Sequence, residues 1–240
     1  MPVIISCLGW FATGFLPRFD AAPGTPDNPA MDSALRILIT AGPTREPIDE
    51  VRFISNRSSG KMGAALADAA IRAGHQVTLI LGPVLAVMPQ GPRRIDLETA
   101  AEMHAAVLQE FPHHDVLIMA AAVADFRPRF VRSGKVERDG TLAIEFEPTA
   151  DIIAAASQLK RPDQRTIGFS LESKSNLDRA RQKMLRKGLD LMVYNPTRTM
   201  DSQTIESILL YPDGRTEELP CRDKADFADI LIERVTALFR

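Results

Sequence analysis

A long polar loop between an apolar run and a helical pattern offers the clearest chemistry in this chain. Apolar residues 37–39 lead into the sequence TAGPTREPID at 40–49, and the loop closes on Gly60 and Gly63, where a helix is expected to begin. A helix N-terminus presents unpaired backbone N–H groups and a positive dipole end, which favour an anion. Because loops this long in compact domains are usually functional, we expect a phosphate-bearing ligand here. The alternative is a tight packing turn at the two glycines.

Two familiar phosphate-binding motifs do not fit this loop. The P-loop pattern G-x-x-x-x-G-K-[ST] fails because Met62 stands where a hydroxyl residue is required. A G-x-G-x-x-G fingerprint does not follow the first apolar run either. The pattern therefore predicts neither a standard nucleoside-triphosphatase loop nor a standard dinucleotide site.

Asn56 and Asp125 are two further candidates, and each also has an ordinary structural explanation. Asn56 lies in the same loop, where asparagine commonly forms turns. Asp125 follows the small residues AAAVA at 120–124, which would let a ligand approach the backbone at the end of a buried strand. A helix cap or an ion pair with Arg127 would explain Asp125 equally well.

Three lysines are candidate anion contacts. Lys135 is expected on the first arm of a hairpin that turns at Asp139-Gly140, either as a solvated edge charge or as a flap residue over a phosphate. Lys183 and Lys187 are spaced i, i+4 on one helix face, which is either solvated or faces an anion.

Apolar runs typical of strands alternate with helical patterns from residue 36 onward. Strands are expected at 36–40, 76–81, 116–121, 165–169 and 188–194, and helices at 61–73, 100–111, 150–159, 176–187 and 223–239. This alternation predicts an α/β fold, with a three-layer, Rossmann-like and mainly parallel sheet flanked by helices. Thr99 and Glu102 have the spacing of a capping box at one helix start.

Two segments interrupt the alternation with hairpin signals. One is 129–147, turning at Asp139-Gly140, and the other is 204–219, turning at Asp213-Gly214. We expect both hairpins to project from the sheet, as a flap and as dimerisation elements. Parallel sheets bind ligands outside the carboxyl ends of their strands. The site is therefore expected in the loops that follow Thr40, Leu81, Ala121, Phe169 and Tyr194.

The composition is that of an ordinary globular domain. The chain has 240 residues, 45% apolar and 25% charged, with a formal net charge of −2, which indicates no general affinity for nucleic acid or membrane surfaces. Cys7 and Cys221 make neither a disulfide framework nor a zinc site, which favours a reducing compartment.

Residues 1–35 differ from the rest and are expected to be a disordered extension or a mis-assigned start, with residues 36–240 forming the α/β domain. The apolar run 3–16 is too short to cross a bilayer as a helix. No Lys or Arg precedes it, which disfavours a cleaved secretion signal. A proline-rich stretch follows, and Met31 is an alternative start.

The sequence ITAGPTREPID at 39–49, continued by VRFISNRSSGKMG at 51–63, resembles the first signature of the phosphopantothenoylcysteine synthetases. The sequence AAVAD at 121–125 resembles their second signature. Lys135, IGF at 167–169, Lys183, Lys187 and Asp190 follow in the order of that family. The resemblance covers about residues 36 to 240 and is to the synthetase half of the bifunctional bacterial coenzyme A biosynthesis protein, without its flavin decarboxylase domain.

The resemblance implies a ligase that joins 4′-phosphopantothenate to cysteine. CTP would activate the carboxylate as an acyl-cytidylate and release pyrophosphate, and the cysteine amine would then displace CMP. The resemblance also implies Mg²⁺, no flavin, a homodimer, a cytoplasmic location, and no nucleic-acid or membrane partner. Association with a separate phosphopantothenoylcysteine decarboxylase is a further expectation.

The same resemblance implies a role for each site residue. Asn56 would bind the acyl group and donate to the oxyanion of the second step, and Lys135 would hold the triphosphate from the flap. The implied substrate and phosphate contacts are Gly42, Thr44, Arg57, Ser58, Ser59, Gly60, Ala121 and Ala122. The implied nucleotide contacts are Asp125, Thr149, Ala150, Asp151, Ile152, Phe169, Lys183 and Lys187. The sequence specifies no metal ligands and does not distinguish CTP from ATP.

One departure and two alternatives remain. Thr149 and Ala150 stand where the family commonly has Asn-Pro, so a backbone contact is expected in place of a side-chain amide contact. A non-catalytic synthetase-like partner or decarboxylase regulator is one alternative, and loss of Asn56 or Lys135 would be its signature. A nicotinamide-dependent reductase is disfavoured by the missing glycine fingerprint and by the lack of a Tyr-x-x-x-Lys pair near Tyr194.

Overall fold

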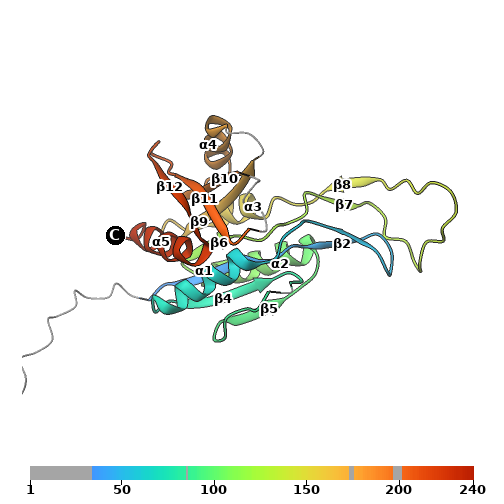
Figure 1. Ribbon diagram of the computed structural model, residues 1–240, viewed down its shortest axis with the longest axis horizontal. Coiled ribbons are helices and arrows are strands. Elements are labelled where there is room, and N and C mark those ends of the chain that lie inside the picture. The colour runs from blue at the N-terminus through green and yellow to red at the C-terminus, as the bar shows by residue number, and fades with distance from the viewer. Residues whose placement is uncertain (1–33, 85, 173–175, 197–201) are drawn as a thin grey trace, which may run out of the picture. The chain divides into compact units, whose positions relative to one another are not determined.

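A mixed sheet of eight strands crosses the part of the chain that the computed structural model describes, residues 34–240 without 85, 173–175 and 197–201. Figure 1 shows its strands, which in spatial order are β12 (Thr216–Asp223), β11 (Thr204–Leu210), β10 (Leu191–Pro196), β9 (Arg165–Glu172), β6 (Val116–Met119), β1 (Arg36–Ala41), β4 (Gln76–Leu81) and β5 (Arg93–Asp96). Neighbours from β10 to β5 pair in parallel, whereas β11 and β12 pair antiparallel. The predicted mainly parallel sheet is confirmed.

The strand order reverses next to β1. The chain runs outward from β1 to β4 and β5 on one side, and from β6 to β9 and β10 on the other. Ile39 of β1 lies in register between Leu79 and Ile118. Such a switch point separates the loops that leave the carboxyl ends of two neighbouring strands, which leaves room for a ligand. Here those loops follow Ala41 and Met119.

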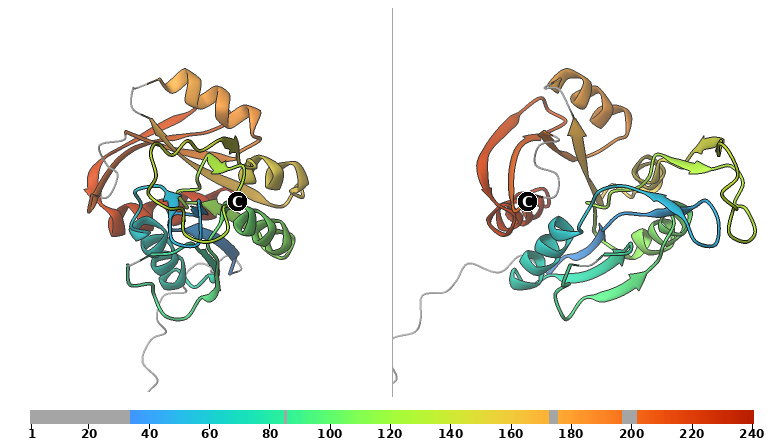
Figure 2. Two further views of the ribbon diagram at one scale, coloured as in Figure 1. Left: turned by 90° about the vertical axis from the view of Figure 1, so that its right-hand side faces the viewer. Right: turned by 45° about the vertical axis from the view of Figure 1, so that its right-hand side comes forward.

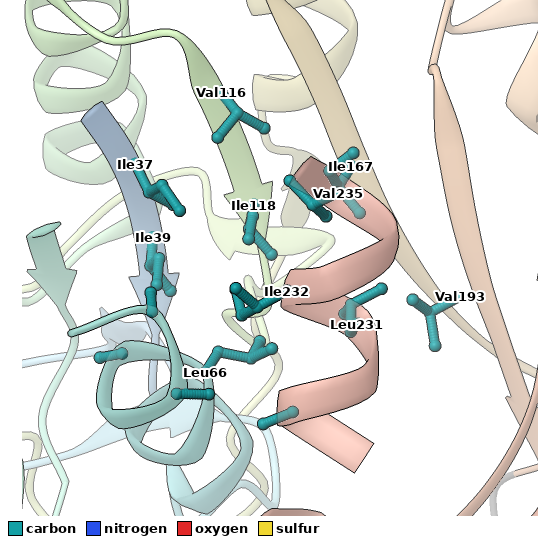
Figure 3. Close-up of a cluster of buried hydrophobic side chains, with 14 of the residues drawn as sticks. Ile37, Ile39, Leu66, Val116, Ile118, Ile167, Val193, Leu231, Ile232 and Val235 are labelled. Carbon is teal, nitrogen blue, oxygen red and sulfur yellow. The ribbon is translucent and has the colours of Figure 1, made fainter. Parts of the chain in front are cut away.

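Helices cover both faces of this sheet (Figure 2). They are α1 (Lys61–Arg72) and α5 (Lys224–Ala237) on one face, and α2 (Ala100–Glu110), α3 (Ile152–Leu159) and α4 (Leu177–Arg186) on the other, with the 3₁₀ turn η1 (Phe111–His113) after α2. Leu66 of α1 and Ile232 of α5 point at the strand residues Ile39 and Ile118 in the buried cluster of Figure 3. Alternate strand residues such as Leu38 pack on the opposite face, which explains the continuously apolar strands.

The helix boundaries follow the predicted capping signals. The hydroxyl of Thr99 accepts the backbone N–H of Glu102, and the Glu102 carboxylate accepts the N–H of Thr99, so the capping box is present. Gly74 follows α1 at φ 83°, a left-handed conformation that ends the helix. Helix α3 begins at Ile152, two residues later than expected, because Asp151 caps it through the N–H of Ala154.

The expected hairpin at 129–147 is only partly right. Strands β7 (Phe126–Pro128) and β8 (Phe146–Pro148) pair antiparallel, but the described residues between them form no strand. Asp139-Gly140 therefore does not turn between paired arms, and Lys135 lies in a long loop. We call residues 129–145 the flap loop. The second hairpin is present, with β11 and β12 joined by a turn at Asp213-Gly214. It does not project from the sheet as expected, because β11 pairs with β10 and the two strands form the antiparallel edge of the main sheet.

A further small hairpin lies inside the opening loop and was not predicted. Strands β2 (Arg45–Pro47) and β3 (Phe53–Ser55) pair antiparallel, and their turn is closed by the N–H of Ile48 donating to the carbonyl of Arg52. This hairpin runs beside β7 and β8 away from the sheet (Figures 1 and 2). We call the β2–β3 hairpin, the β7–β8 pair and the flap loop together the arm.

Ala34–Arg240 form one compact unit. Leu35 already belongs to its core, because its side chain is buried and its carbonyl accepts the N–H of Gln76. The expectation of a disordered extension or mis-assigned start concerns residues that, apart from the last two, lie outside the described part of the chain.

Candidate active site

Two adjoining cavities open at the carboxyl ends of β6 and β9. The smaller, about 190 Å³, is the α1 cavity, lined by Arg57, Ser58, Ser59, Gly60, Lys61, Met62, Gly63, Ala120, Ala121, Ala122, Phe169, Leu171, Asn195, Ile205 and Lys224. The larger, about 510 Å³, is the α4 cavity, lined by Asn56, Met119, Ala121, Ala122, Val123, Asp125, Thr149, Ala150, Asp151, Ile152, Ile153, Gly168, Phe169, Leu171, Lys183, Lys187, Leu189 and Met192. Both lists contain Ala121, Ala122 and Phe169, so one ligand chain could extend from one cavity into the other.

The α1 cavity has the chemistry of an anion site. Gly60 caps α1 at φ 79°, and its carbonyl accepts the N–H of Ala64, which makes the first hydrogen bond of the helix. The backbone N–H groups of residues 61–63 therefore have no partner within the helix. The side chains of Arg57 and Lys61 form no ion pair with any residue in the described ranges. Two unpaired cations beside a helix N-terminus favour a doubly charged group such as a phosphate.

The glycines at this end of α1 set how closely the helix approaches the sheet. A Cβ built on Gly63 would lie 2.2 Å from the Cβ of Ala41, a distance that no side chain tolerates. Helix α1 therefore rests directly on the end of β1. This contact brings its N-terminus to the switch point of the sheet.

Asn56 lies at the base of the β2–β3 hairpin and lines the α4 cavity. Its side-chain nitrogen donates to the backbone oxygens of Ala122, at 3.1 Å, and Val123, at 2.9 Å. Two carbonyl acceptors determine which end of the amide faces them, so Oδ1 faces away. Asn56 therefore presents an acceptor to a ligand, and the expected N–H donation to an oxyanion is not available in this arrangement.

The α4 cavity carries one paired lysine and one unpaired lysine from the same helix end. Lys187 forms an ion pair with Asp151, with Nζ and Oδ2 2.7 Å apart. The side-chain ammonium of Lys183 has no ion pair or hydrogen bond to the described residues. An unpaired, half-buried ammonium in a cavity is stabilised by an anionic ligand. This supports, for Lys183, the expectation that the helix face carrying Lys183 and Lys187 meets an anion.

Thr149 does not offer its side chain to the cavity. Its hydroxyl donates to the carbonyl of Ala124 at 2.6 Å, and its backbone N–H donates to the carbonyl of Asp125. Ala150 has no polar side chain, and Asp151 caps α3. Both carboxylate oxygens of Asp151 are thus engaged, one by the N–H of Ala154 and the other by Lys187. Polar contacts between this stretch and a ligand are therefore limited to its backbone groups, and the expected backbone contact stays a prediction.

Gly42 and Thr44 line neither of the two cavities. Gly42 adopts φ 76° and packs so closely that an added Cβ would lie 2.6 Å from Cγ1 of Val84. The Thr44 hydroxyl is fully buried and accepts the N–H of Ala124 at 3.0 Å. Both residues shape the loop that carries the site, and the structure does not bring them to the cavity walls with the other predicted residues.

Lys135 is also absent from both cavity walls. Its side chain is exposed on the flap loop and has no partner among the described residues. The remaining predicted residues lie together: Arg57 to Gly60 in the α1 cavity, Asp125, Lys183 and Lys187 in the α4 cavity, and Ala121, Ala122 and Phe169 in both.

Sequence reasoning missed the contribution of the C-terminal elements. Ile205 of β11 and Lys224 of α5 line the α1 cavity from far along the chain, and no local motif marks them. Lys61 does carry a local signal, because a lysine on the first turn of a helix beside a phosphate site is a typical anion contact.

The described residues contain no group of three or more His, Cys, Asp or Glu side chains that could hold a metal ion. Magnesium usually binds to proteins through one or two carboxylates together with substrate phosphates. The described part of the chain thus offers no dedicated cage, and we derive no step from a protein-bound metal. Nor does any helix of the described chain have the length and apolar character required to cross a membrane.

The family model for the DNA/pantothenate metabolism flavoprotein C-terminal domain matches residues 33–238. The chain belongs to this family. Its relatives include the coenzyme A biosynthesis bifunctional protein CoaBC of Vibrio cholerae, 46% identical over 67% of this chain and 41% of that protein. The CoaBC protein of Escherichia coli is 40% identical over 85% of this chain and 52% of that protein. The chain therefore spans about half the length of the curated relatives it matches.

A solved structure agrees with this family assignment. The C-terminal domain of a CoaBC protein superimposes with a TM-score of 0.76 at 35% identity, covering 87% of this chain and 97% of that domain. The three-layer fold and the mixed sheet are therefore those of the C-terminal CoaBC domain.

Proposed function

We propose that this chain is a phosphopantothenate–cysteine ligase that uses CTP. The observation that carries the proposal is the pair of adjoining cavities that meet at Ala121 and Ala122, each with an unpaired lysine. Lys61 lies at the N-terminus of α1 in one cavity, and Lys183 lies in the last turn of α4 in the other. A ligase of this kind must hold two separate phosphate-bearing substrates with their reacting ends together, and this arrangement suits that need.

The α1 cavity accommodates the phosphate of 4′-phosphopantothenate in this proposal. The N-terminus of α1, the hydroxyls of Ser58 and Ser59 and the cations Arg57 and Lys61 are its contacts. The acyl end of the substrate then extends past Ala121 toward Asn56. This direction follows from the two cavity walls that share Ala121 and Ala122.

The α4 cavity accommodates the nucleotide. Lys183 and Lys187 contact its phosphates, and the backbone of 149–152 borders its base. Mg²⁺ would accompany CTP as a counter-ion and would supply charge neutralisation. Phe169, at the boundary of the cavities, separates the nucleotide from the pantothenate chain.

The reaction proceeds by two displacements. An oxygen of the pantothenate carboxylate attacks the α-phosphorus of CTP, the bond from that phosphorus to its bridging oxygen breaks, and pyrophosphate leaves. The cysteine amine then attacks the acyl carbon, the acyl carbon–oxygen bond breaks, CMP leaves and the amine proton passes to solvent. The protein supplies position and positive charge, so no protein nucleophile is required.

Asn56 serves the second displacement as an acceptor. Both N–H groups of its side chain are held by the carbonyls of Ala122 and Val123, so Oδ1 is available to the incoming amine. An acceptor oriented in this way would hold the cysteine amine beside the acyl carbon. This role replaces the donation to an oxyanion that the residue type alone suggested.

The arm contacts a second copy of the chain in this proposal. It exposes large apolar side chains, namely Val51, Phe53, Ile54, Phe126, Phe130, Val131 and Phe146. Exposed apolar clusters of this kind mark protein interfaces. Association with a separate decarboxylase is the other expected contact.

The deciding experiment is an assay of pyrophosphate release. The chain is incubated with 4′-phosphopantothenate, cysteine and Mg²⁺, and CTP is compared with ATP. Release that depends on both CTP and phosphopantothenate supports the ligase. No release with either nucleotide contradicts it and favours a non-catalytic partner, and thermal shifts with CTP, ATP and NADPH then show which nucleotide the chain binds.

A further inference from the structure

The turn of the β2–β3 hairpin holds a buried carboxylate. The Asp49 side chain is 0% exposed and accepts the backbone N–H groups of Val51, at 2.9 Å, and Arg52, at 2.7 Å. It also accepts the N–H of Val136 at 3.1 Å, a residue of the flap loop. Burial alone would raise the pKa of this carboxyl, but these backbone donors and the Arg52 guanidinium together hold the pKa well below its usual range. Asp49 is therefore ionised at any physiological pH.

Arg52 completes the contact from the same turn. Its guanidinium donates to Asp49 at 2.9 Å and to the carbonyl of Val136 at 2.6 Å. Both backbone polar groups of Val136 are thus bound, one by each member of the Asp49–Arg52 pair. Figures 1 and 2 show the hairpin turn and the flap loop beside each other at the outer end of the arm.

Neighbouring residues of the flap loop are tied to the same turn. The N–H of Gly134 donates to the Glu50 carboxylate at 2.9 Å, and the N–H of Arg132 donates to the carbonyl of Ile48 at 3.1 Å. In contrast, residues 137–144 make no backbone hydrogen bond within the described chain. The turn of the β2–β3 hairpin is therefore what fixes the first half of the flap loop.

Lys135 lies between two of the fixed residues. Gly134 and Val136 are each bound through the backbone, while the Lys135 side chain remains exposed and unpaired among the described residues. The position of its ammonium is accordingly limited by the backbone on either side. Strand β3, three residues long, continues from Arg52 to the base of the hairpin, where Asn56 lines the α4 cavity.

We propose that Asp49 and Arg52 are positioning residues that hold the flap-loop backbone so that Lys135 is presented to the triphosphate of the nucleotide. The inference rests on the proposed ligase function and adds two residues that contact neither cavity. Their effect is exerted through Lys135 on the first displacement, in which charge develops on the phosphates. The second displacement, served by Asn56, does not depend on them.

The first test is a double-mutant comparison of pyrophosphate release. Asp49→Asn and Arg52→Gln should each lower kcat/KM for CTP by about tenfold or more, the loss expected for a charge-assisted contact. In a Lys135→Ala background the same changes should cost less than about twofold, because the residue through which they act is gone. Arg129→Gln, which breaks the flap-loop ion pair with Glu145, is the matched control and should leave kcat/KM unchanged.

Three results would overturn the inference. Losses of equal size with and without Lys135 would mean that the pair acts independently of it. Losses confined to capture of preformed acyl-cytidylate by cysteine would place the pair in the second displacement. A loss in Arg129→Gln as large as that in Arg52→Gln would mean that any disturbance of the flap loop suffices.

A second measurement does not depend on activity. Trypsin should cleave the native chain slowly after Lys135, because the next peptide group is held by Asp49 and Arg52. Arg52→Lys keeps the positive charge but loses the guanidinium that donates to both Asp49 and the carbonyl of Val136. This variant should be cleaved several-fold faster, with little change in thermal midpoint. Unchanged cleavage overturns the inference even if CTP proves not to be a substrate, whereas a wild-type chain that releases no pyrophosphate contradicts only the proposed function.

Discussion

The side-chain nitrogen of Asn56 lies 2.9 Å from the carbonyl oxygen of Val123, and this contact turns the amide oxygen away from the backbone. The nitrogen also donates to Ala122, one residue from Ala121, which lies on the wall of both cavities. Asn56 is thus fixed to the strand end that the two cavities share. The predictions below follow from this contact and from others of its kind.

Replacing Asn56 with alanine should lower the rate of cysteine ligation by about a hundredfold or more, on the scale seen when one preorganised catalytic contact is removed. Pyrophosphate release in the first displacement should fall much less. Rapid-quench measurement of each step separates the two effects. Ser55→Ala removes one hydrogen bond from the same loop, the 2.7 Å contact with the carbonyl of Thr44, without touching a cavity, and it should leave ligation near wild type. Equal loss of ligation in both variants would show that Asn56 only supports the loop.

Replacing Lys183 with alanine should raise KM for CTP by about tenfold to a hundredfold, since a charged hydrogen bond is worth about 1.5–3 kcal/mol. The thermal midpoint should change little, because Lys183 has no partner to lose in the described chain. Arg186→Ala on the exposed side of the same helix is the control, and it should leave KM for CTP unchanged. A similar KM increase in both variants would indicate that CTP binding responds to the overall positive charge of α4 and not to a specific contact with Lys183.

Replacing Gly63 with alanine should destabilise the fold by about 1–3 kcal/mol, as for other overpacked contacts. The added methyl would lie 2.2 Å from the Cβ of Ala41 and would push α1 away from β1. Chemical denaturation measures the loss. Asp68→Ala on the exposed face of α1 weakens only a surface ion pair with Arg72 and should cost about 0.5 kcal/mol or less. A Gly63→Ala variant as stable as wild type would contradict the close helix–sheet contact.

Acidification should weaken the folded state through His75. Burial lowers the pKa of this imidazole below its usual 6.5. Its Nδ1 accepts the N–H of Leu35, so a proton on Nδ1 would face the Leu35 N–H and replace a hydrogen bond with two opposed donors. A lowered histidine pKa means that the unfolded chain binds the proton first, so this contribution to stability is present above pH 6.5 and is lost as pH falls through the folded pKa.

The measurement is the thermal midpoint from about pH 7.5 to about pH 5.5, a window that brackets histidine titration. His75→Gln keeps an acceptor and a donor but does not titrate, and its midpoint should fall less steeply than that of the wild-type chain. Some slope should remain, because burial also lowers the pKa of His114. Identical slopes in the two proteins would exclude His75 as a contributor.

Charged substitutions on the arm should dissociate the proposed dimer. Phe130 is 70% exposed on the flap loop, and Phe130→Asp would place a charge in an interface formed there. Sedimentation at micromolar concentration should show a monomer for this variant and a dimer for wild type. Val87→Asp, on an exposed loop away from the arm, should leave the dimer intact. A monomeric wild-type chain would contradict the dimer itself.

Much of the fold could be predicted because its signals are local. The continuously apolar run at 116–119 indicated a strand buried on both faces, and Thr99 with Glu102 marked a helix start through side-chain contacts three residues apart. The flap was predicted less well. Its turn signal at Asp139-Gly140 is real in sequence, but residues 129–145 lack a second layer to pack against, so the paired strands stop at Pro128 and Phe146.

The sequence alone determined which charged and polar residues lie near the strand ends. It also determined that they follow one another along the chain in the order typical of the family. Only the tertiary structure decided which of them meet. It brought Asn56 against Ala122 across a separation of 66 residues, and it turned the Thr44 hydroxyl inward. It also joined Asp49 to the flap loop through Val136, 87 residues away. Such contacts depend on the order of strands in a sheet, and that order is set by the burial of whole faces rather than by any local pattern of residues.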